Sequence, residues 1–252
     1  MPDIETLFGV SIGLFIGLGI FIHGFRMLSR KRLIENIPTS KIRSLALGLV
    51  EIAGKVVAFE GTVMKSPFAQ KDCVYYLFKV EEYRRQGKNS RWVTVKKGEY
   101  RPEFYVQDDT GKVLVDPAGA EISVPKDFEY NSGLLNDPPA QVKEFLKAND
   151  ISHDSFLGLN KRMRYREYLI EPGDTVYVMG TAANNPVLAH TEDEHTSKLI
   201  IQKGVNQKFF YVSDRSEKEL VSSMKWQAFG GITTGAVVCV ICLAYILSNI
   251  LI

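Results

Sequence analysis

Strongly apolar residues are gathered at the two ends of the sequence, and shorter patterns of alternating character fill the space between them. The first apolar segment covers residues 4–25 and the second covers residues 229–252. An α-helix needs about 20 predominantly apolar residues to cross the hydrocarbon core of a bilayer. Each segment is therefore predicted to be a transmembrane helix, and the middle of the chain is predicted to fold beside the membrane.

Basic residues stand on the inner side of both apolar segments. They are Arg26, Arg30, Lys31 and Arg32 after the first segment, and Lys218 and Lys225 before the second. Lys and Arg near the ends of membrane spans mark the cytoplasmic side. We therefore expect a two-span protein of the cell membrane, with its middle in the cytoplasm and both termini outside.

A cleaved signal peptide is the alternative for the first apolar segment. Signal peptides begin with a basic region and end at a small-residue cleavage site. Here the acidic Asp3 and Glu5 come first, and His23 to Phe25 close the segment. This pattern favours a span that is retained.

Between the apolar ends, hydrophobic residues mostly alternate with polar ones, which is typical of β-strands. The predicted strands cover residues 50–58, 73–83, 91–95, 103–106, 112–116, 164–170, 175–181, 199–202 and 209–212. Many short strands separated by Gly-containing turns indicate a mainly-β barrel or sandwich of OB or SH3-like character. The fold class expected is thus a membrane protein in which two transmembrane helices flank a soluble β domain with a helical insertion.

Two turns are predicted with specific chemistry. Asp108 to Gly111 reads as a hairpin turn in which Asp and Gly adopt positive φ. Pro172, Gly173 and Asp174 follow Glu171, and Pro at the second position with Gly at the third is the requirement of a type II turn.

Helical patterns separate the domains. Residues 26–47 are predicted to be a juxtamembrane helix or linker. Residues 40–50, which continue into the start of the β domain, are predicted to be a short amphipathic helix or a linker packed on that domain. Residues 48–213 form the β domain, with a helical insertion at 123–160 that interrupts the sheet and contains a helix at 141–148. Residues 214–228 are predicted to be a second juxtamembrane helix, which begins with a capping box from Ser216 to Glu219 and leads into the second span.

Small residues recur every fourth position in both predicted spans. They are Gly9, Gly13 and Gly17 in the first, and Gly231 and Gly235 in the second. Such spacing lets helix backbones approach closely, although Gly is also frequent in membrane helices for other reasons. We expect helix packing at these positions, either between the two spans or in a homo-oligomer.

Metal and redox chemistry are not expected. Cys73 lies in an apolar strand pattern, whereas Cys239 and Cys242 lie inside the second span, where a redox partner could not reach them. His190 and His195 flank three acidic residues, but their spacing is not that of two ligands on one helix face. We expect a solvated loop there, with no metal and no cofactor.

Basic and aromatic residues are interleaved between residues 79 and 101, and Arg162, Arg164 and Arg166 alternate along a predicted strand. Such mixtures bind single-stranded nucleic acid on some OB folds. The alternative is a hairpin that faces lipid headgroups or solvent. The whole chain has a net charge of only +2, so no nucleic-acid partner is expected.

Five blocks in the middle of the sequence resemble one known domain. They are 66–68 (SPF), 73–76 (CVYY), 104–106 with 109–111 (FYV and DTG), 115–120 (VDPAGA), and 165–167 with 170–180 (YRE and IEPGDTVYVMG). In this order they resemble the GIDE domain, also called the BAM (beside a membrane) domain, of MULAN-type membrane E3 ubiquitin ligases. The resemblance covers most of residues 49–213 and implies a β domain between two membrane anchors.

The resemblance does not extend to a RING finger. A RING needs paired Cys and His zinc ligands, and this sequence has three Cys and four His. No Ser, Cys or carboxylate constellation with catalytic spacing is evident either. We therefore expect a non-catalytic module. Its spans lie in the lipid bilayer, and its β domain binds a protein partner or the lipid surface. The alternatives are a ligase-like component that works with a separate conjugation system, and an enzyme of unrecognised type.

Overall fold

The computed structural model describes residues 4–134, 136–152, 160–185, 196–205, 209–214 and 217–250. The chain separates into two compact units. One contains the residues up to 38 and from 216 onward, and the other contains residues 39–215. We describe each unit by itself.

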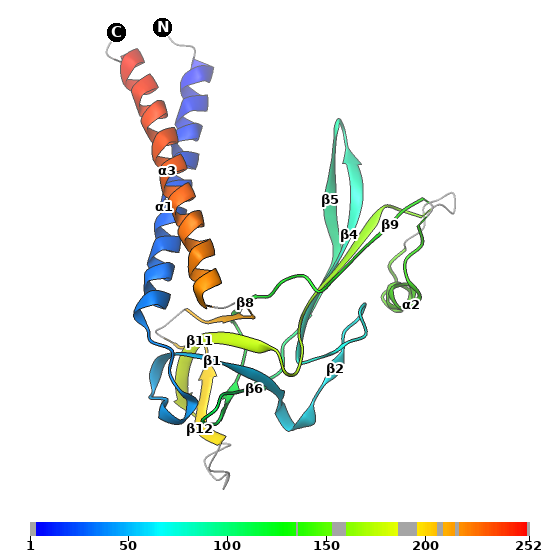
Figure 1. Ribbon diagram of the computed structural model, residues 1–252. Coiled ribbons are helices and arrows are strands. Elements are labelled where there is room, and N and C mark those ends of the chain that lie inside the picture. The colour runs from blue at the N-terminus through cyan, green and yellow to red at the C-terminus, as the bar shows by residue number, and fades with distance from the viewer. Residues whose placement is uncertain are drawn as a thin grey trace. The chain divides into compact units, whose positions relative to one another are not determined.

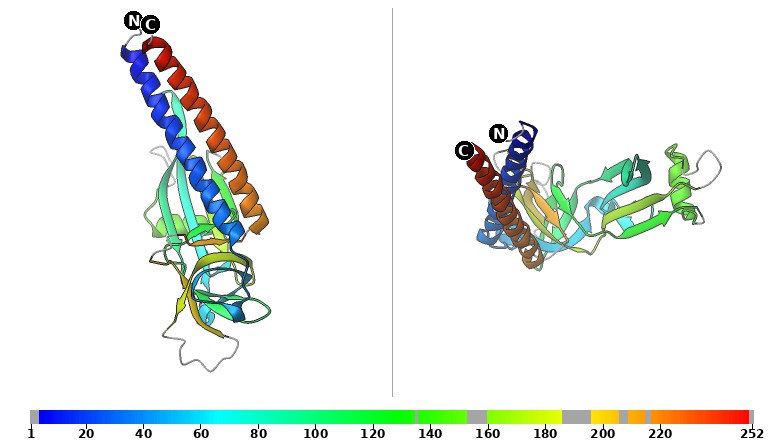
Figure 2. Two further views of the ribbon diagram at one scale, coloured as in Figure 1. Left: turned by 90° about the vertical axis from the view of Figure 1, so that its left-hand side faces the viewer. Right: turned by 90° about the horizontal axis from the view of Figure 1, so that it is seen from above.

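The helical unit consists of two long helices that lie side by side, α1 (Ile4–Asn36) and α3 (Glu217–Ile250) (Figures 1 and 2). Within them, Glu5–Asn36 and Val221–Asn249 have mean hydropathies of 2.0 and 2.1 and are long and apolar enough to cross a membrane. Large apolar side chains such as Phe8, Phe15 and Phe229 are exposed on the helices. This surface suits a hydrocarbon environment, so the helices are consistent with membrane association.

The β unit is built around a closed five-stranded barrel. Its strands are β1 (Gly48–Ala58), β6 (Phe104–Gln107), β7 (Lys112–Val115), β12 (Thr196–Gln202) and β11 (Thr175–Asn184). They follow the order β1-β6-β7-β12-β11, and β11 pairs antiparallel with β1 to close the ring. Two short strands, β13 (Tyr211–Ser213) and β8 (Glu121–Ser123), extend the sheet from β11. The predicted fold class, mainly β with two flanking apolar helices, is confirmed.

The alternation of β1 explains the barrel core. Val50, Ile52 and Val56 point inward and join a buried cluster with Phe104 and Val178. At Lys55, next to Gly54, the strand passes from pairing with β11 to pairing with β6. A side chain at Gly54 would collide with the backbone of Gln107, so the close approach of these strands requires glycine.

A second sheet of four strands forms a separate lobe of the β unit (Figure 1). Its order is β5 (Asn89–Tyr100), β4 (Tyr75–Gln86), β10 (Met163–Ile170) and β9 (Phe128–Ser132). Helix α2 (Ala140–Ala148) packs on one face of this sheet. The remaining small elements are β2 (Met64–Lys65), β3 (Asp72–Cys73) and two 3₁₀ turns, η1 (Ile42–Ser44) and η2 (Phe59–Gly61).

The prediction that residues 123–160 interrupt the sheet is wrong in part. Helix α2 is present, but β9 lies within this range and pairs with β10. Phe128 and Tyr130 pack toward the core beneath α2, while Glu129 and Asn131 alternate to the other side. The short alternation of five residues thus forms an outer strand of the sheet.

Of the two structures predicted for residues 40–50, the amphipathic helix does not form and the linker packed on the domain does. Only the short turn η1 is present, and β1 begins at Gly48, where φ is +112°. Ile42 is buried in the barrel core, and the hydroxyl of Thr39 donates to the fully buried Glu51 carboxylate (2.6 Å). Tertiary contacts of these residues with the barrel replace helical hydrogen bonds.

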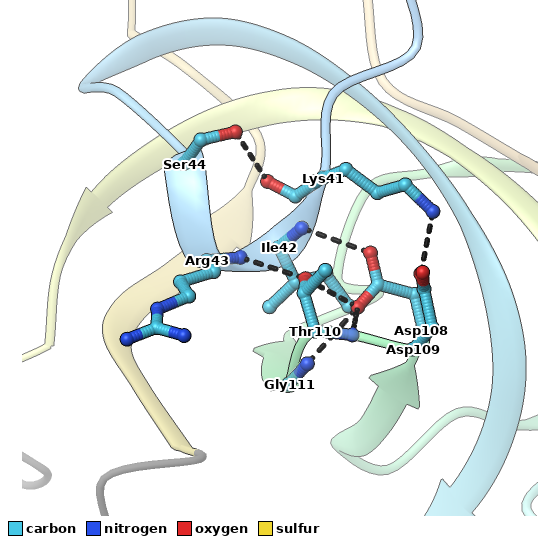
Figure 3. Close-up of polar contacts among 8 residues, drawn as sticks. All are labelled: Lys41, Ile42, Arg43, Ser44, Asp108, Asp109, Thr110 and Gly111. Carbon is cyan, nitrogen blue, oxygen red and sulfur yellow. Dashed lines mark hydrogen bonds and ion pairs between the residues drawn. The ribbon is translucent and has the colours of Figure 1, made fainter.

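The β6–β7 hairpin is confirmed, but its predicted positive φ angles are wrong, because none of residues 108–111 adopts one. Instead the Asp108 carboxylate accepts the backbone N–H groups of Thr110 (2.7 Å), Gly111 (3.0 Å) and Ile42 (3.0 Å) (Figure 3). Burial tends to raise the pKa of Asp108, but these hydrogen bonds and one from the Thr110 hydroxyl outweigh it and lower that pKa. The side chain of Asp108 therefore replaces left-handed backbone in this turn.

Candidate binding surface

The four-stranded sheet has one covered face and one open face. On the covered face, Phe78, Val80 and Tyr165 are buried against Val142 and Leu146 of α2. Residues that alternate with these in each strand point to the opposite face. The strand register therefore assigns every residue of the open face.

The open face combines cationic and aromatic side chains from three neighbouring strands. Its members include Lys79, Glu81 and Tyr83 on β4, Trp92, Thr94 and Lys97 on β5, and Arg162, Arg164, Arg166 and Tyr168 on or beside β10. Tyr83 lies directly opposite Trp92, and Glu81 lies directly opposite Arg164. We call this set the open sheet face.

Each of three cations on the open sheet face lies over an aromatic ring. The Arg164 guanidinium is 4.4 Å from the centre of the Trp92 ring, and that of Arg162 is 4.6 Å from the Tyr83 ring. Lys79 Nζ lies 5.7 Å from the Tyr168 ring. Cation–π contacts of this kind stabilise exposed pairs by about 0.5–1 kcal/mol, and here they also hold the charged groups in fixed orientations.

Glu81 joins two of these arginines. It is 6% exposed, and its Oε2 accepts hydrogen bonds from Arg164 Nε (2.8 Å) and Arg166 Nη2 (2.5 Å). Desolvation tends to raise the pKa of Glu81, but the two arginine hydrogen bonds and charges outweigh it and lower that pKa. Glu81 therefore stays ionised and fixes the positions of both guanidinium groups.

A cavity of about 520 Å³ opens at one end of the open sheet face. Trp92, Arg162, Arg164 and Asn131 line it, together with Leu134, which is 61% exposed. Aromatic, arginine and exposed aliphatic groups are thus available side by side. This combination is typical of sites that anchor a protein partner.

A larger cavity of about 790 Å³ follows β1 on the barrel. Much of its lining is the strand from Ala53 to Ala58, and two of its charged side chains, Lys41 and Asp109, pair with one another at 2.5 Å (Figure 3). Because these two charges neutralise one another, the barrel cavity presents fewer uncompensated charged groups to a partner than the open sheet face does.

The predicted packing glycines occupy the helical unit. A side chain at Gly13 would meet Cys242 at 3.2 Å, one at Gly17 would meet Val238 at 2.9 Å, and one at Gly235 would meet the Phe21 backbone at 2.5 Å. Gly231 lies against Gly24, whereas a side chain added at Gly9 would meet no other described part of the structure within 4 Å.

Gly24 is a packing residue that the sequence reasoning missed. An added Cβ there would lie 2.6 Å from the backbone nitrogen of Ile232. Its spacing of seven residues from Gly17 places it on nearly the same helix face. An interval of seven residues, in addition to intervals of four, is therefore the sequence signal for Gly24.

The predicted topology residues Arg26, Arg30, Lys31 and Arg32 all lie in the later turns of α1, where Lys31 pairs with Glu35 (2.5 Å). The predicted turn residues lie in the β unit. Gly173 has a φ of +94°, and its N–H donates to Val56 O (2.8 Å), while Asp174 O accepts from the Val56 N–H (2.8 Å). The turn from Pro172 to Asp174 is thereby attached to β1.

The cysteines and histidines fall in different settings. Burial raises the pKa of the Cys73 thiol to about 11, so this thiol is unreactive at neutral pH. Cys239 and Cys242 are free thiols within α3. The segment from His190 to His195 and the Ser216 end of the expected capping box lie outside the described residues.

The sequence and structure together define a class, a β-barrel module with two apolar flanking helices. The family model described as "GIDE: E3 Ubiquitin ligase" matches residues 75–246, a range that includes β4, β5, β10 and most of α3. The chain belongs to the GIDE family. No curated protein matches it, and no solved structure does.

Proposed function

We propose that this protein is a membrane-anchored, non-catalytic module that holds a protein partner at the membrane surface. Its family relates it to E3 ubiquitin ligases, and its two apolar helices supply the anchor. The β unit supplies the binding surface. Recruitment of a partner to a membrane requires no reacting group, only a fixed surface of suitable chemistry.

The observation that carries this proposal is the open sheet face. Trp, Tyr and Arg dominate the binding energy of protein interfaces, and Trp92, Tyr83 and Arg164 stand together there. Their orientations are set by stacking and by the buried Glu81. A surface that is already ordered loses less entropy when a partner binds.

The topology belongs to the same proposal. Arg26, Arg30, Lys31 and Arg32 follow the apolar part of α1, and this distribution supports a cytoplasmic β unit with both termini outside. A cysteine introduced at Asn131 should then escape labelling by a membrane-impermeant thiol reagent in intact cells. Labelling before lysis would reverse the assignment.

Site-specific photo-crosslinking in native membranes tests the binding role. A photoreactive residue replaces Thr94, which is exposed on the open sheet face, and the matched control replaces Glu144, which is exposed on α2. We expect a discrete protein adduct from position 94 that weakens when Trp92→Ala is added, and none from position 144. Equal adducts at both positions, or none at position 94, would contradict the proposal.

The family description favours a second candidate, a component of a ubiquitin-type ligase that works with a separate conjugation system. Its test is transfer of ubiquitin or a ubiquitin-like protein from a charged conjugating enzyme in the presence of the purified full chain. Faster discharge that depends on the open sheet face would replace the non-catalytic proposal. An unchanged discharge rate leaves partner holding as the function.

A further inference from the structure

Three cationic positions lie in one row across the open sheet face. The register places Lys97 of β5 directly opposite Lys79 of β4, and Lys79 directly opposite Arg166 of β10. Directly opposed residues of antiparallel strands share a face, and like charges in this arrangement destabilise the sheet. The three cations therefore repel one another in the isolated protein, and a bound anion would reduce this repulsion.

The charges in this row are incompletely compensated. Arg166 shares Glu81 with Arg164, and its buried Nε has no hydrogen-bond partner among the described residues. A buried donor without a partner costs free energy. Lys79 has no acidic partner within the described part of the chain, and its amino group lies over the Tyr168 ring.

The rest of the face adds to the positive excess. Arg162, which is exposed, forms no ion pair with any residue that the structure describes and lies over Tyr83. Glu129, across from Arg166 on β9, is already paired with Lys126 (2.6 Å). Glu99, near Lys97 on β5, is likewise paired with Arg101 (2.6 Å). The three carboxylates Glu81, Glu99 and Glu129 thus face a larger group of basic residues: Lys79, Lys97, Arg162, Arg164 and Arg166, besides Arg101 and Lys126.

We propose that the open sheet face binds an acidic protein segment, with its Asp or Glu carboxylates along the row of Lys97, Lys79 and Arg166 and an apolar side chain in the cavity beside Trp92. This inference rests on the proposed partner-binding function and names the chemistry of the partner. Guanidinium groups present planar, directional donors that match carboxylates. Leu134 and Trp92 supply the apolar wall that an amino-acid side chain would occupy.

The aromatic rings argue against single-stranded nucleic acid as the occupant. Such ligands bind by stacking their bases on accessible aromatic rings. Here Arg162, Arg164 and Lys79 already cover one face of Tyr83, Trp92 and Tyr168 respectively. Clusters of Lys and Arg also attract anionic lipid surfaces, and the vesicle comparison below tests that occupant.

The direct test uses the full chain in nanodiscs of phosphatidylcholine, a lipid without net charge. The probe is a fluorescent synthetic peptide of alternating Glu and Leu, and the control peptide carries Gln in place of Glu. We expect binding of the Glu peptide alone. Lys79→Gln and Lys97→Gln should each weaken it by roughly threefold to fivefold, and Lys147→Gln, an exposed change on α2, should not.

Stability measurements separate recognition from folding. Because Lys97→Gln removes one of two directly opposed cations, the variant should melt at the same temperature as the parent or higher. Weaker peptide binding by a variant of unchanged stability supports the proposal. Equal binding of both peptides, or equal losses in Lys97→Gln and Lys147→Gln, overturns it.

Two further outcomes would assign the face to another occupant. Tighter, Lys79-dependent binding of phosphatidylserine vesicles or of oligo-dT than of the Glu peptide would overturn the proposal. The crosslink from position 94 distinguishes a failure of the acidic-segment proposal from a failure of the partner-binding function. If that crosslink persists undiminished in a Lys79→Gln, Lys97→Gln double variant, the acidic segment is wrong and the partner-binding function stands; if it never forms, the function itself fails.

Discussion

The barrel and the four-stranded sheet differ in the groups that hydrogen-bond their buried carboxylates. In the barrel region, Glu51 is fully buried, and neutral hydroxyls of Thr39 and Tyr177 donate to it. On the sheet, Glu81 is held by two arginines and leaves a positive excess around it. The barrel ring is also closed strand to strand, whereas the sheet keeps one face uncovered. The difference indicates that the barrel provides stability and the sheet provides recognition.

The largest expected difference between the barrel and the sheet comes from a matched pair of side-chain truncations. Ile52→Ala removes a fully buried barrel side chain and should lower the free energy of unfolding by about 2–5 kcal/mol. Thr94→Ala, on the open sheet face, should change it by no more than about 0.5 kcal/mol. Urea unfolding of the full chain in detergent, followed by circular dichroism, measures both. Comparable effects would remove the division of roles.

Two glycines with positive φ sharpen the same contrast. Gly173→Val should cost about 1–3 kcal/mol because its φ is +94°, and the damage should spread through the Val56 hydrogen bonds into β1. Gly87→Val, at the β4–β5 hairpin tip with a φ of +62°, has similar strain. An added Cβ would meet nothing within 4 Å at either position, but Gly87 joins two strands of the four-stranded sheet, whereas Gly173 is bonded to β1 of the barrel.

Protease digestion of membrane-inserted protein distinguishes these two variants. We expect Gly173→Val to make the β unit cleavable at several places while the two apolar helices persist. In Gly87→Val, cleavage should be confined to the hairpin. Parent-like resistance of Gly173→Val would show that the β10–β11 turn does not control the barrel.

The smallest expected effect concerns Glu81 and acid. Its folded pKa is lowered, so its contribution to stability is complete above the unfolded value of about 4.3 and is lost as the pH falls through the folded pKa. Glu81→Gln should therefore lower the free energy of unfolding by about 1–2 kcal/mol at neutral pH. This gap should close in acid. A gap that does not narrow at all as the pH falls below the unfolded value of about 4.3 would mean that the ionised carboxylate is unimportant.

Much of the barrel could be predicted because its strands carry their own signal. In β1 of the barrel, as in β10 of the four-stranded sheet, inward apolar residues alternate with polar ones, so the pattern is visible in a single sequence. Other parts depend on partners far along the chain. Ile42 is buried in the barrel core and Asp108 accepts its N–H, so residues 40–50 form the packed linker, although their local apolar spacing equally favoured a helix.

The candidate surface could be predicted only in pieces. The alternating Arg162, Arg164 and Arg166 and the basic, aromatic segment 79–101 were both evident in the sequence. Their meeting depends on the register of β10 against β4, and on an irregularity in the β4–β5 pairing after Val80. The apolar alternation of each strand excludes a one-residue slip, which would turn every side chain to the opposite face. It does not distinguish between registers that differ by two residues.

The closure of the barrel has a consequence for biosynthesis. Gly48 of β1 pairs with Ala182 of β11, so the first strand to leave the ribosome pairs along much of its length with one of the last. At typical translation rates this interval is on the order of 10 s, and contacts so distant in sequence form slowly. During that time the apolar β1 is available to wrong partners. Glu51 and Lys55 interrupt its hydrophobic run, and charged residues in such positions are expected to lower the aggregation tendency of an exposed strand.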